Sequence, residues 1–239
     1  MKNTKMPLIL ILTGLAIVLF TATSCTTKQG VYRDTAKSVV MVTSPDEPGG
    51  GTGFIVRAAV NGKKGVKAVL TNAHVCGVVQ TGPLMVSNDT SIEMSPIIRV
   101  NKEHDLCLLY SVPGPALSVS SNDLGEFEEL YVVGHPRLSP KTPTEGVYIG
   151  EEIAVLPDTV DAVTGVCPSG TKELDTLFGT ICLRKMQLAK ATFPIFPGNS
   201  GSPVVNAAGE LVGIVNSANR DNQGGFIPLR YVKEFLDNE

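Results

Sequence analysis

Residues 197–203 read Pro-Gly-Asn-Ser-Gly-Ser-Pro, and the rest of the chain can be interpreted around the hydroxyl of Ser200. Gly198 and Gly201 flank this serine, and glycine permits backbone dihedrals and close approaches that a side chain would prevent. A tight turn of small residues can aim several backbone N–H groups at one point beside an exposed serine. That geometry would hold a developing oxyanion next to a nucleophile. Taken alone, the stretch is also typical of an ordinary loop.

The composition is that of a globular protein. The chain has 239 residues, which is enough for one large or two small domains with a sizeable core. Hydrophobic residues make up 43% and charged residues 18%, a balance that excludes a disordered chain. The formal net charge is −3, and Lys and Arg form no cluster in the sequence. We therefore do not expect nucleic acid as a partner.

The first residues predict an export signal. Lys2 and Lys5 precede the apolar run 7–20, and small residues follow at 21–25. A basic segment, an apolar segment of this length and a small-residue cleavage region are the parts of a signal peptide. The apolar run is short for a membrane-spanning helix. We interpret residues 1–24 as a signal peptide of the lipoprotein type.

The end of this segment indicates how the mature chain would be attached to a membrane. Ala22-Thr23-Ser24-Cys25 resembles a bacterial lipobox, in which the cysteine is lipidated and becomes the first mature residue. This would attach the protein to a membrane of the bacterial cell envelope through Cys25. Cleavage after Ser24 by an ordinary signal peptidase is the alternative. Both interpretations place the protein outside the cytoplasm.

Four cysteines lie beyond Cys25: Cys76, Cys107, Cys167 and Cys182. An even number of cysteines in an exported chain predicts disulfides, and four cysteines allow three pairings. Cys167 with Cys182 would close a local loop, and Cys76 with Cys107 would then join the regions around His74 and Asp105. Free buried thiols are the alternative. Because no pair has the CxxC spacing, we expect no zinc site.

The mature chain reads as an all-β protein. Residues 25–35 are polar and are interpreted as a tether. Short apolar or β-branched runs follow at 38–43, 53–57, 66–71, 83–87, 95–100, 106–111, 130–134 and 147–155. Gly, Pro or Asn separates most of these runs, and Asn61-Gly62 is a hairpin signal. Many short strands with turns between them indicate a β-sandwich or β-barrel.

The sequence also predicts that the mature chain is divided into two β-rich halves and ends in a helix. The segment 113–123 is rich in Pro, Gly and Asn, and we take it as the connection between residues 36–118 and 119–239. Two small barrels facing each other would form a cleft, where functional sites tend to occur. The apolar spacing of residues 229–236 predicts a C-terminal helix.

Two residues of the first half can activate the serine. A serine nucleophile needs a base, and the base needs a group that fixes its tautomer. His74 follows a predicted strand and can project into a cleft, and Asp105 stands at the start of an apolar strand, where an unpaired carboxylate would be costly. His104 is the alternative base. His135 is interpreted as a loop or packing residue.

Four segments in this order resemble those of a known family: Gly50-Gly51-Thr52-Gly53-Phe54, Thr71-Asn72-Ala73-His74-Val75, His104-Asp105-Leu106 and Pro197-Gly198-Asn199-Ser200-Gly201. Together they are similar to those of chymotrypsin-fold (trypsin-like) serine proteases, in the bacterial HtrA/Deg-like or glutamyl-endopeptidase-like branch. The resemblance covers about residues 36–236. It implies two six-stranded antiparallel β-barrels packed face to face, with the active site in the cleft and a short C-terminal helix.

The resemblance also implies roles for individual residues. Ser200 would be the nucleophile, His74 the general base and Asp105 its orienter. The backbone of Gly198, Asn199 and Ser200 would form the oxyanion hole. The substrate pocket would be lined by Pro194, Asn216, Ser217, Ala218 and Gly225. Since none of these is charged, small or apolar side chains are the expected substrate preference. The strand 213–217 would offer an edge to an extended peptide.

The expected function is therefore that of an exported serine endopeptidase that hydrolyses polypeptides through an acyl-enzyme on Ser200. Such chemistry requires no metal and no cofactor. We expect no C-terminal PDZ domain, because the chain stops soon after the predicted helix. Asn199 cannot form the ion pair that an Asp makes in proteases activated by a new N-terminus, so we expect no such activation. The alternatives are a protease-fold binding or scaffold protein and an esterase-like hydrolase.

Overall fold

The structure is a computed structural model that describes residues 27–45, 48–77, 82–158, 166–167, 170–176, 179–218 and 223–238. The predictions for residues 1–24 and for lipidation of Cys25 lie outside these described residues. Within the described ranges, no helix has both the length and the apolar character needed to cross a membrane.

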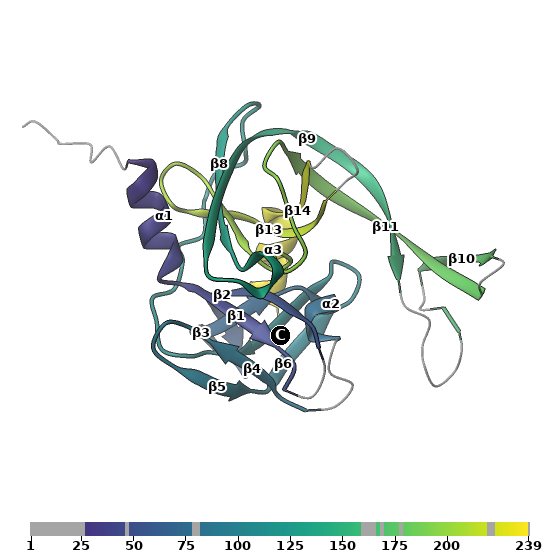
Figure 1. Cartoon of the computed structure of the whole chain (residues 1–239), viewed down its shortest axis with the longest axis horizontal. Coiled ribbons are helices and arrows are strands. Elements are labelled where there is room, and N and C mark those ends of the chain that lie inside the picture. Colours follow the sequence, from purple (N-terminus) through teal and green to yellow (C-terminus); the bar gives the residue numbers. More distant parts are fainter. Residues whose placement is uncertain are drawn as a thin grey trace, which may run out of the picture.

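The first barrel is a seven-stranded sheet in the order β5-β4-β1-β2-β3-β7-β6 (Figure 1). Its strands are β1 (Val39–Thr43), β2 (Gly50–Val60), β3 (Lys63–Thr71), β4 (Leu84–Ser87), β5 (Ile92–Ser95), β6 (Ile97–Asn101) and β7 (Leu106–Tyr110). The two edge strands β5 and β6 are consecutive in the chain and are separated by Pro96 alone. Because proline has no N–H to donate, it interrupts the ladder where this segment passes from one edge to the other. The segment closes the sheet, and β5 and β6 together count as one of six barrel strands.

The second barrel is also a seven-stranded sheet, in the order β10-β11-β14-β13-β12-β8-β9. Its strands are β8 (Glu129–Gly134), β9 (Thr142–Asp158), β10 (Thr171–Thr176), β11 (Gly179–Ala191), β12 (Pro203–Val205), β13 (Leu211–Ala218) and β14 (Gly224–Pro228). An additional pairing of β11 with β9 closes six of these strands into a ring. β10 pairs with β11 outside this ring. The prediction of two six-stranded antiparallel barrels is confirmed, with β10 as an extra strand.

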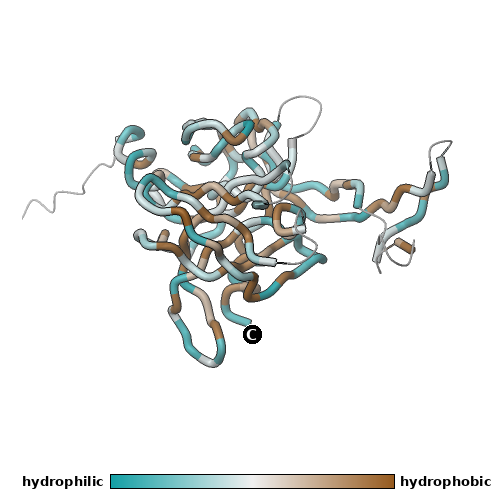
Figure 2. The backbone as a smooth tube through the Cα atoms, turned by 60° about the horizontal axis from the view of Figure 1, so that its bottom comes forward, coloured by the Kyte–Doolittle hydropathy of each residue, from teal (hydrophilic) through white to brown (hydrophobic). Residues whose placement is uncertain are grey.

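Alternation along the strands produces three apolar cores. In β1, Val40 and Val42 point into the first barrel, whereas Val39 lies in a core shared with the second barrel. Successive side chains of a strand point to opposite faces. A strand that is apolar on both faces can therefore contribute to the interior of the first barrel and to the core that the two barrels share. The interior of the second barrel forms the third core, around Phe193 and Phe226. Figure 2 shows apolar strands in the body of the molecule and polar residues at many of its turns.

The structure contains the hairpin turn at Asn61-Gly62 and the C-terminal helix that the sequence predicts. Asn61 and Gly62 both have positive φ, 50° and 74°, as a two-residue hairpin turn of type I′ requires, and they join β2 to β3. The predicted C-terminal helix is α3 (Leu229–Asp237). It buries Val232 and Leu236 in the shared core. Both predictions are confirmed.

The interpretation of residues 25–35 as a polar tether is wrong for the described part of this segment. Residues Lys28–Ala36 form helix α1, whose first turn is capped when the Thr27 hydroxyl accepts the N–H of Gly30. Val31 is 2% exposed and joins the shared core. Tyr32 packs edge to face on Tyr131 of β8, at 5.5 Å between ring centroids. The sequence pattern gave little sign of this helix, because only Val31 and Thr35 among its residues are buried.

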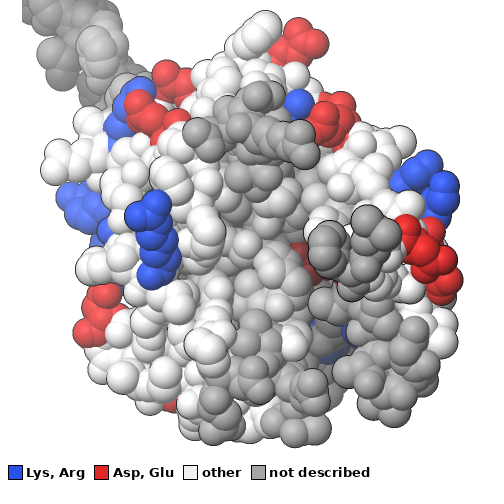
Figure 3. Space-filling view, turned by 45° about the vertical axis from the view of Figure 1, so that its right-hand side comes forward, with Lys and Arg blue, Asp and Glu red and all other residues white. Residues whose placement is uncertain are grey.

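A long ribbon of β9 and β11 extends away from the second barrel (Figure 1). It carries exposed apolar side chains, among them Ile153 (69%) and Val155 (55%). A disulfide joins Cys167 to Cys182 on this ribbon, and a second joins Cys76 to Cys107 in the first barrel. These are the two pairings considered from the sequence. On the face in Figure 3, the coloured acidic and basic side chains are scattered and form no surface of one sign.

Candidate active site

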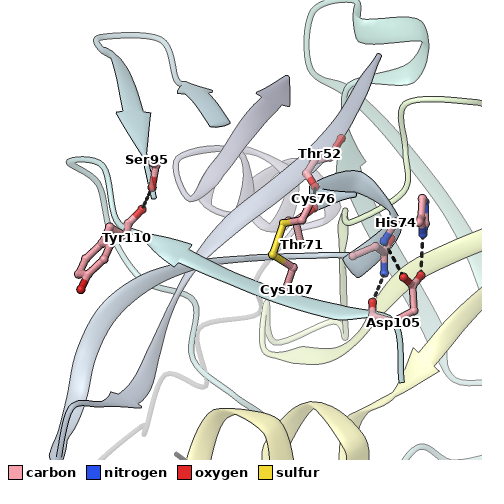
Figure 4. Close-up of a disulfide and its surroundings, with 9 residues drawn as sticks. Thr52, Thr71, His74, Cys76, Ser95, Asp105, Cys107 and Tyr110 are labelled. Carbon is pink, nitrogen blue, oxygen red and sulfur yellow. Dashed lines mark hydrogen bonds and ion pairs between the residues drawn. A yellow bond between two sulfur atoms is a disulfide. The ribbon is translucent and has the colours of Figure 1, made fainter. Parts of the chain in front are cut away.

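Asp105 and His74 are brought together by the ends of two elements of the first barrel (Figure 4). His74 lies in α2 (Ala73–Cys76), a single turn that follows β3. Asp105 precedes β7 and has a φ of 52°, a left-handed conformation that Asp tolerates better than most residues. The carbonyl of Asp105 accepts the N–H of Ala73 at 3.0 Å and the amide of Asn72 at 3.1 Å. These bonds fix the turn that carries His74 against the turn that carries Asp105.

The carboxylate of Asp105 then orients the imidazole. One oxygen accepts the backbone N–H of His74 at 2.8 Å, and the other lies 2.6 Å from its Nδ1. Because an ionised carboxylate only accepts hydrogen bonds, Nδ1 carries the proton and Nε2 presents a lone pair. Asp105 is 8% exposed, whereas the His74 side chain is half exposed. The imidazole is thus anchored on its buried side and open on the other, as a general base requires.

Asn216 joins this pair to the second barrel. Its amide donates to the second carboxylate oxygen of Asp105 at 2.5 Å, and its backbone carbonyl accepts the hydroxyl of Ser200 at 3.2 Å. Hydrogen bonds therefore run from His74 through Asp105 and Asn216 to Ser200. From the sequence, Asn216 was expected only to line the substrate pocket. Its contact with Asp105 was missed because nothing in the local pattern relates strand β13 to the start of β7.

Hydrogen bonds hold the backbone of the Ser200 turn in one shape. The carbonyl of Pro197 accepts the N–H of Arg137 at 2.5 Å, and the N–H of Asn199 donates to Phe196 at 3.0 Å. Further along, the N–H of Gly201 donates to Val215 at 2.9 Å. In the described part of the chain, only the N–H groups of Gly198 and Ser200 in this turn have no acceptor. Buried backbone donors are normally paired, so these two N–H groups are candidates to bind an oxyanion.

One predicted member of the oxyanion hole is corrected here. The N–H of Asn199 is already donated to the carbonyl of Phe196, so it is not available to an oxyanion. Gly198, in contrast, has the φ of +94° that suits glycine, and an added Cβ would lie 2.4 Å from the carbonyl oxygen of His135. A side chain at this position would push the turn away from the segment that holds it.

Two hollows adjoin the site on the side of the β9–β11 ribbon. One, of about 240 Å³, is lined by His74, Asp105, Asn216 and Ser217 together with Asp158, Arg184 and apolar residues of the ribbon. The other, of about 350 Å³, includes Ser217, Gly225, Lys190 and Glu152. Both hollows contain charged side chains, in contrast to the uncharged set expected from the sequence. Pro194 is exposed and lines neither hollow; the side chain of Ala218 lies outside the described features.

The predicted peptide-binding edge is shorter than expected. Residues 213–215 of β13 pair or hydrogen-bond on both sides, with β14 and with the segment that leads into β12. They cannot accept a further strand. Among the residues that the structure describes, Ser217 and Ala218 pair with β14 alone, so the free side of β13 begins near Asn216. His104 is also placed away from catalysis, because its ring stacks on Tyr231 of α3 at 4.1 Å.

The Cys76–Cys107 disulfide connects α2, which carries His74, to β7, which begins just after Asp105 (Figure 4). Replacing both cysteines by Ala is expected to lower the free energy of unfolding by about 3–4 kcal/mol, because the bond closes a loop with a sequence separation of 31. Urea denaturation measures this loss. The matched change of Cys167 and Cys182 should mainly release the exposed ribbon and affect global unfolding less. Equal global losses would contradict this prediction.

His135 lies beneath the Ser200 turn and is 7% exposed. Its Nδ1–H donates to the carbonyl of Ser139 at 2.8 Å, and its Nε2 is buried without a partner among the described residues. Burial lowers the pKa of His135 from its usual value, and the positive charge of Lys141 lowers this pKa further. The hydrogen bond to Ser139 and the negative charge of Asp89 act in the opposite direction, but burial is the largest cause. The folded protein thus binds this proton less readily than the unfolded chain does.

Stability should consequently fall as the pH is lowered. The contribution of neutral His135 is complete above the unfolded pKa near 6.5 and is lost as the pH falls toward the lower folded pKa. We expect His135→Asn, whose amide can replace Nδ1–H, to remove up to about 1.4 kcal/mol per pH unit from this dependence. Urea denaturation between pH 5 and 7.5 tests it. An unchanged slope would show that other groups cause the acid sensitivity.

Comparison with known proteins identifies the family. The trypsin-like peptidase domain matches residues 51–214, which is more than half of the chain and includes His74, Asp105 and Ser200. The chain belongs to the trypsin-like peptidase family. This trypsin-like chain is 26% identical over 199 residues to the putative serine protease HhoB of Synechocystis, covering 81% of this chain and 41% of the relative. It is also 26% identical over 181 residues to a serine protease HtrA-like protein of Staphylococcus aureus, covering 70% of this chain and 21% of the relative.

The trypsin-like chain spans less than half the length of these two relatives. Among solved structures, it is similar to the active form of the Rv3671c protease of M. tuberculosis, with a TM-score of 0.67 and 20% identity, covering 86% of this chain and 82% of that one. At this identity, the likeness supports the fold. The HtrA-like resemblance inferred from the sequence is confirmed by the two named relatives.

Proposed function

We propose that this trypsin-like chain is a serine endopeptidase in which Ser200 is the nucleophile, His74 the general base and Asp105 the group that orients His74. The observation that carries the proposal is the 2.6 Å contact between His74 Nδ1 and the buried Asp105 carboxylate. It leaves Nε2 as the proton acceptor on the exposed side of the imidazole. The relatives are named as serine proteases, and this favours neither a scaffold protein nor an esterase.

The reaction uses atoms that the described geometry presents. The Ser200 hydroxyl turns from the carbonyl of Asn216 toward His74, transfers its proton to Nε2, and its oxygen attacks the scissile carbonyl. The carbonyl oxygen becomes an oxyanion that accepts the N–H groups of Gly198 and Ser200. His74 then protonates the leaving amine, and an acyl-enzyme remains on Ser200. Water, deprotonated by His74, releases the acid product through a second oxyanion.

The substrate proposed for this site is an extended polypeptide. The free side of β13 from Asn216 onward can pair with a peptide backbone, and the ribbon of β9 and β11 forms a neighbouring wall. Near the expected primary pocket, Phe193 and Ile195 fill the space beside Gly224. Asn216, Ser217 and Gly225, which were expected to line that pocket, are uncharged, so small or apolar side chains are the proposed preference next to the scissile bond.

The proposed location is outside the cytoplasm, at the bacterial cell envelope, with an anchor at lipidated Cys25. Two disulfides support an oxidising compartment, and the N-terminal sequence supports export. The intact mass of the mature protein from the membrane fraction tests the anchor. A mass that includes a diacylglycerol and begins at Cys25 is expected; an unmodified chain beginning at Cys25 would support ordinary cleavage.

The proposed activity is tested by labelling the intact protein with a fluorophosphonate and mapping the adduct by mass spectrometry. We expect one adduct, on Ser200. The rate at which the protein cleaves a mixed peptide library should fall in proportion to the fraction of protein that is labelled. An activated serine reacts with this probe, whereas an ordinary hydroxyl does not. The absence of both labelling and cleavage, or an adduct on another serine, would overturn the assignment.

A further inference from the structure

We propose that Thr52, which the sequence marks only as part of a family motif, is a positioning residue for the oxyanion-binding turn. Thr52 belongs to β2 of the first barrel, whereas the turn belongs to the second barrel. The inference rests on the proposed peptidase function and assigns a further residue to the same site. Thr52 would act through the backbone of Gly198 and Ser200 without touching the substrate.

Thr52 holds both of these residues by their carbonyl groups. Its hydroxyl donates to the carbonyl of Gly198 at 2.8 Å, and its backbone N–H donates to the carbonyl of Ser200 at 2.8 Å. The same hydroxyl oxygen accepts the N–H of His135 at 2.9 Å. Because a backbone N–H can only donate, the hydroxyl proton is directed to Gly198. The side chain therefore has one satisfactory hydrogen-bonding arrangement.

The first barrel holds Thr52 itself rigidly. Thr52 is fully buried, with 0% exposure, and its carbonyl accepts the hydroxyl of Thr71 at 2.7 Å. Thr71 is the last residue of β3, and His74 follows in α2 (Figure 4). One buried hydrogen-bond chain thus connects the strand that leads to the proposed base with the turn that carries the proposed oxyanion donors.

The shape of the turn depends on these bonds. The carbonyl of Gly198 belongs to the peptide group next to the one that carries the Gly198 N–H, so fixing it limits the φ and ψ rotations of Gly198 that separate the two groups. The carbonyl of Ser200 similarly limits rotation beside the Ser200 N–H. The contact is close, because a Cβ on Gly201 would lie 2.0 Å from the carbonyl oxygen of Thr52. Glycine at 201 is therefore needed for Thr52 to approach the turn.

The proposed role requires the hydroxyl group of Thr52, and not only a side chain of its size. Valine has nearly the same shape but lacks the hydroxyl, so Thr52→Val would leave the Gly198 carbonyl and the His135 N–H without this partner. Serine keeps the hydroxyl and loses only the methyl group. The pair of variants separates hydrogen bonding from packing.

The test measures kcat and KM on a peptide substrate, together with the affinity for a peptide aldehyde of the same sequence. The aldehyde forms a hemiacetal whose oxygen occupies the oxyanion position. We expect Thr52→Val to lower both kcat and aldehyde affinity by about 10- to 100-fold, because small misplacements have effects of this size, with KM within about 2-fold. Thr52→Ser should restore both to within about 3-fold of the wild type.

Matched controls make the result decisive. Thr35→Val removes another buried threonine hydroxyl, in α1, and should leave kcat unchanged. Unchanged kcat and aldehyde affinity in Thr52→Val would overturn the inference, as would equal losses in the Val and Ser variants. If Thr52→Val does not fold, Thr52→Ala replaces it in the comparison with Thr52→Ser. Failure of the wild type to be labelled at Ser200 would instead refute the proposed peptidase function.

Discussion

Replacing Ser200 by Ala is expected to lower kcat for peptide hydrolysis by about a million-fold, which is the order of effect that loss of a triad nucleophile produces. The variant keeps the turn, because the backbone carbonyl of Ser200 makes the bond to Thr52, and the hydroxyl makes one bond among the described residues, to Asn216. Binding of a non-hydrolysable peptide should therefore change little. Initial rates with a fluorogenic peptide measure the loss.

Ser202→Ala provides the matched control for this change. Ser202 lies two residues away, is 0% exposed, and its hydroxyl is buried without a partner among the described residues. Its removal should leave kcat within a few-fold of the wild type. If Ser200→Ala retained more than about one part in a thousand of the activity, Ser200 would not be the nucleophile, since the oxyanion hole and binding alone give a far slower reaction.

Replacing Asp105 by Asn is expected to lower kcat by about ten-thousand-fold. The carboxylate accepts three hydrogen bonds, from His74 N, His74 Nδ1 and the amide of Asn216, and an asparagine has one oxygen and an NH₂ group that donates. If the NH₂ group faces His74, Nδ1 must accept and Nε2 must carry the proton. The imidazole is then in the wrong tautomer to deprotonate Ser200.

Asp123→Asn is the matched control, because Asp123 is exposed in the segment between the barrels. It removes the same charge and should leave kcat unchanged. The rate of fluorophosphonate labelling should fall with kcat in Asp105→Asn, since both depend on activation of Ser200. A loss of less than about 10-fold in either rate would contradict the assigned role of Asp105.

Local patterns predicted much of the fold. Short apolar and β-branched runs predicted most strands, Asn61-Gly62 predicted the hairpin between β2 and β3, and the apolar spacing of residues 229–236 predicted α3. These features depend on interactions between residues close in sequence or on burial of one face. Helix α1 was missed because its stability depends on Tyr131 and on the shared core, both distant in sequence.

For the candidate site, the sequence identified residue types and their order, but not their contacts. It could not show that the Asn199 N–H is already donated to Phe196, because a turn's hydrogen bonds depend on its dihedrals. It also could not show that β13 is covered on both sides up to Val215, because strand order is a long-range property. The sequence also provided no sign that the ribbon brings Arg184 and Asp158 beside His74, because that contact depends on strand order as well.

The identities of His74, Asp105 and Ser200, and the small residues that surround the serine, are written in the chain itself, because chemistry and backbone freedom belong to each residue. Their assembly is a property of the packed barrels. Asn216 reaches Asp105 across 111 positions of sequence, and Thr52 reaches Gly198 across 146. Such contacts exist only after both barrels have closed and share a core, since burial then gives each polar group the partner that it requires.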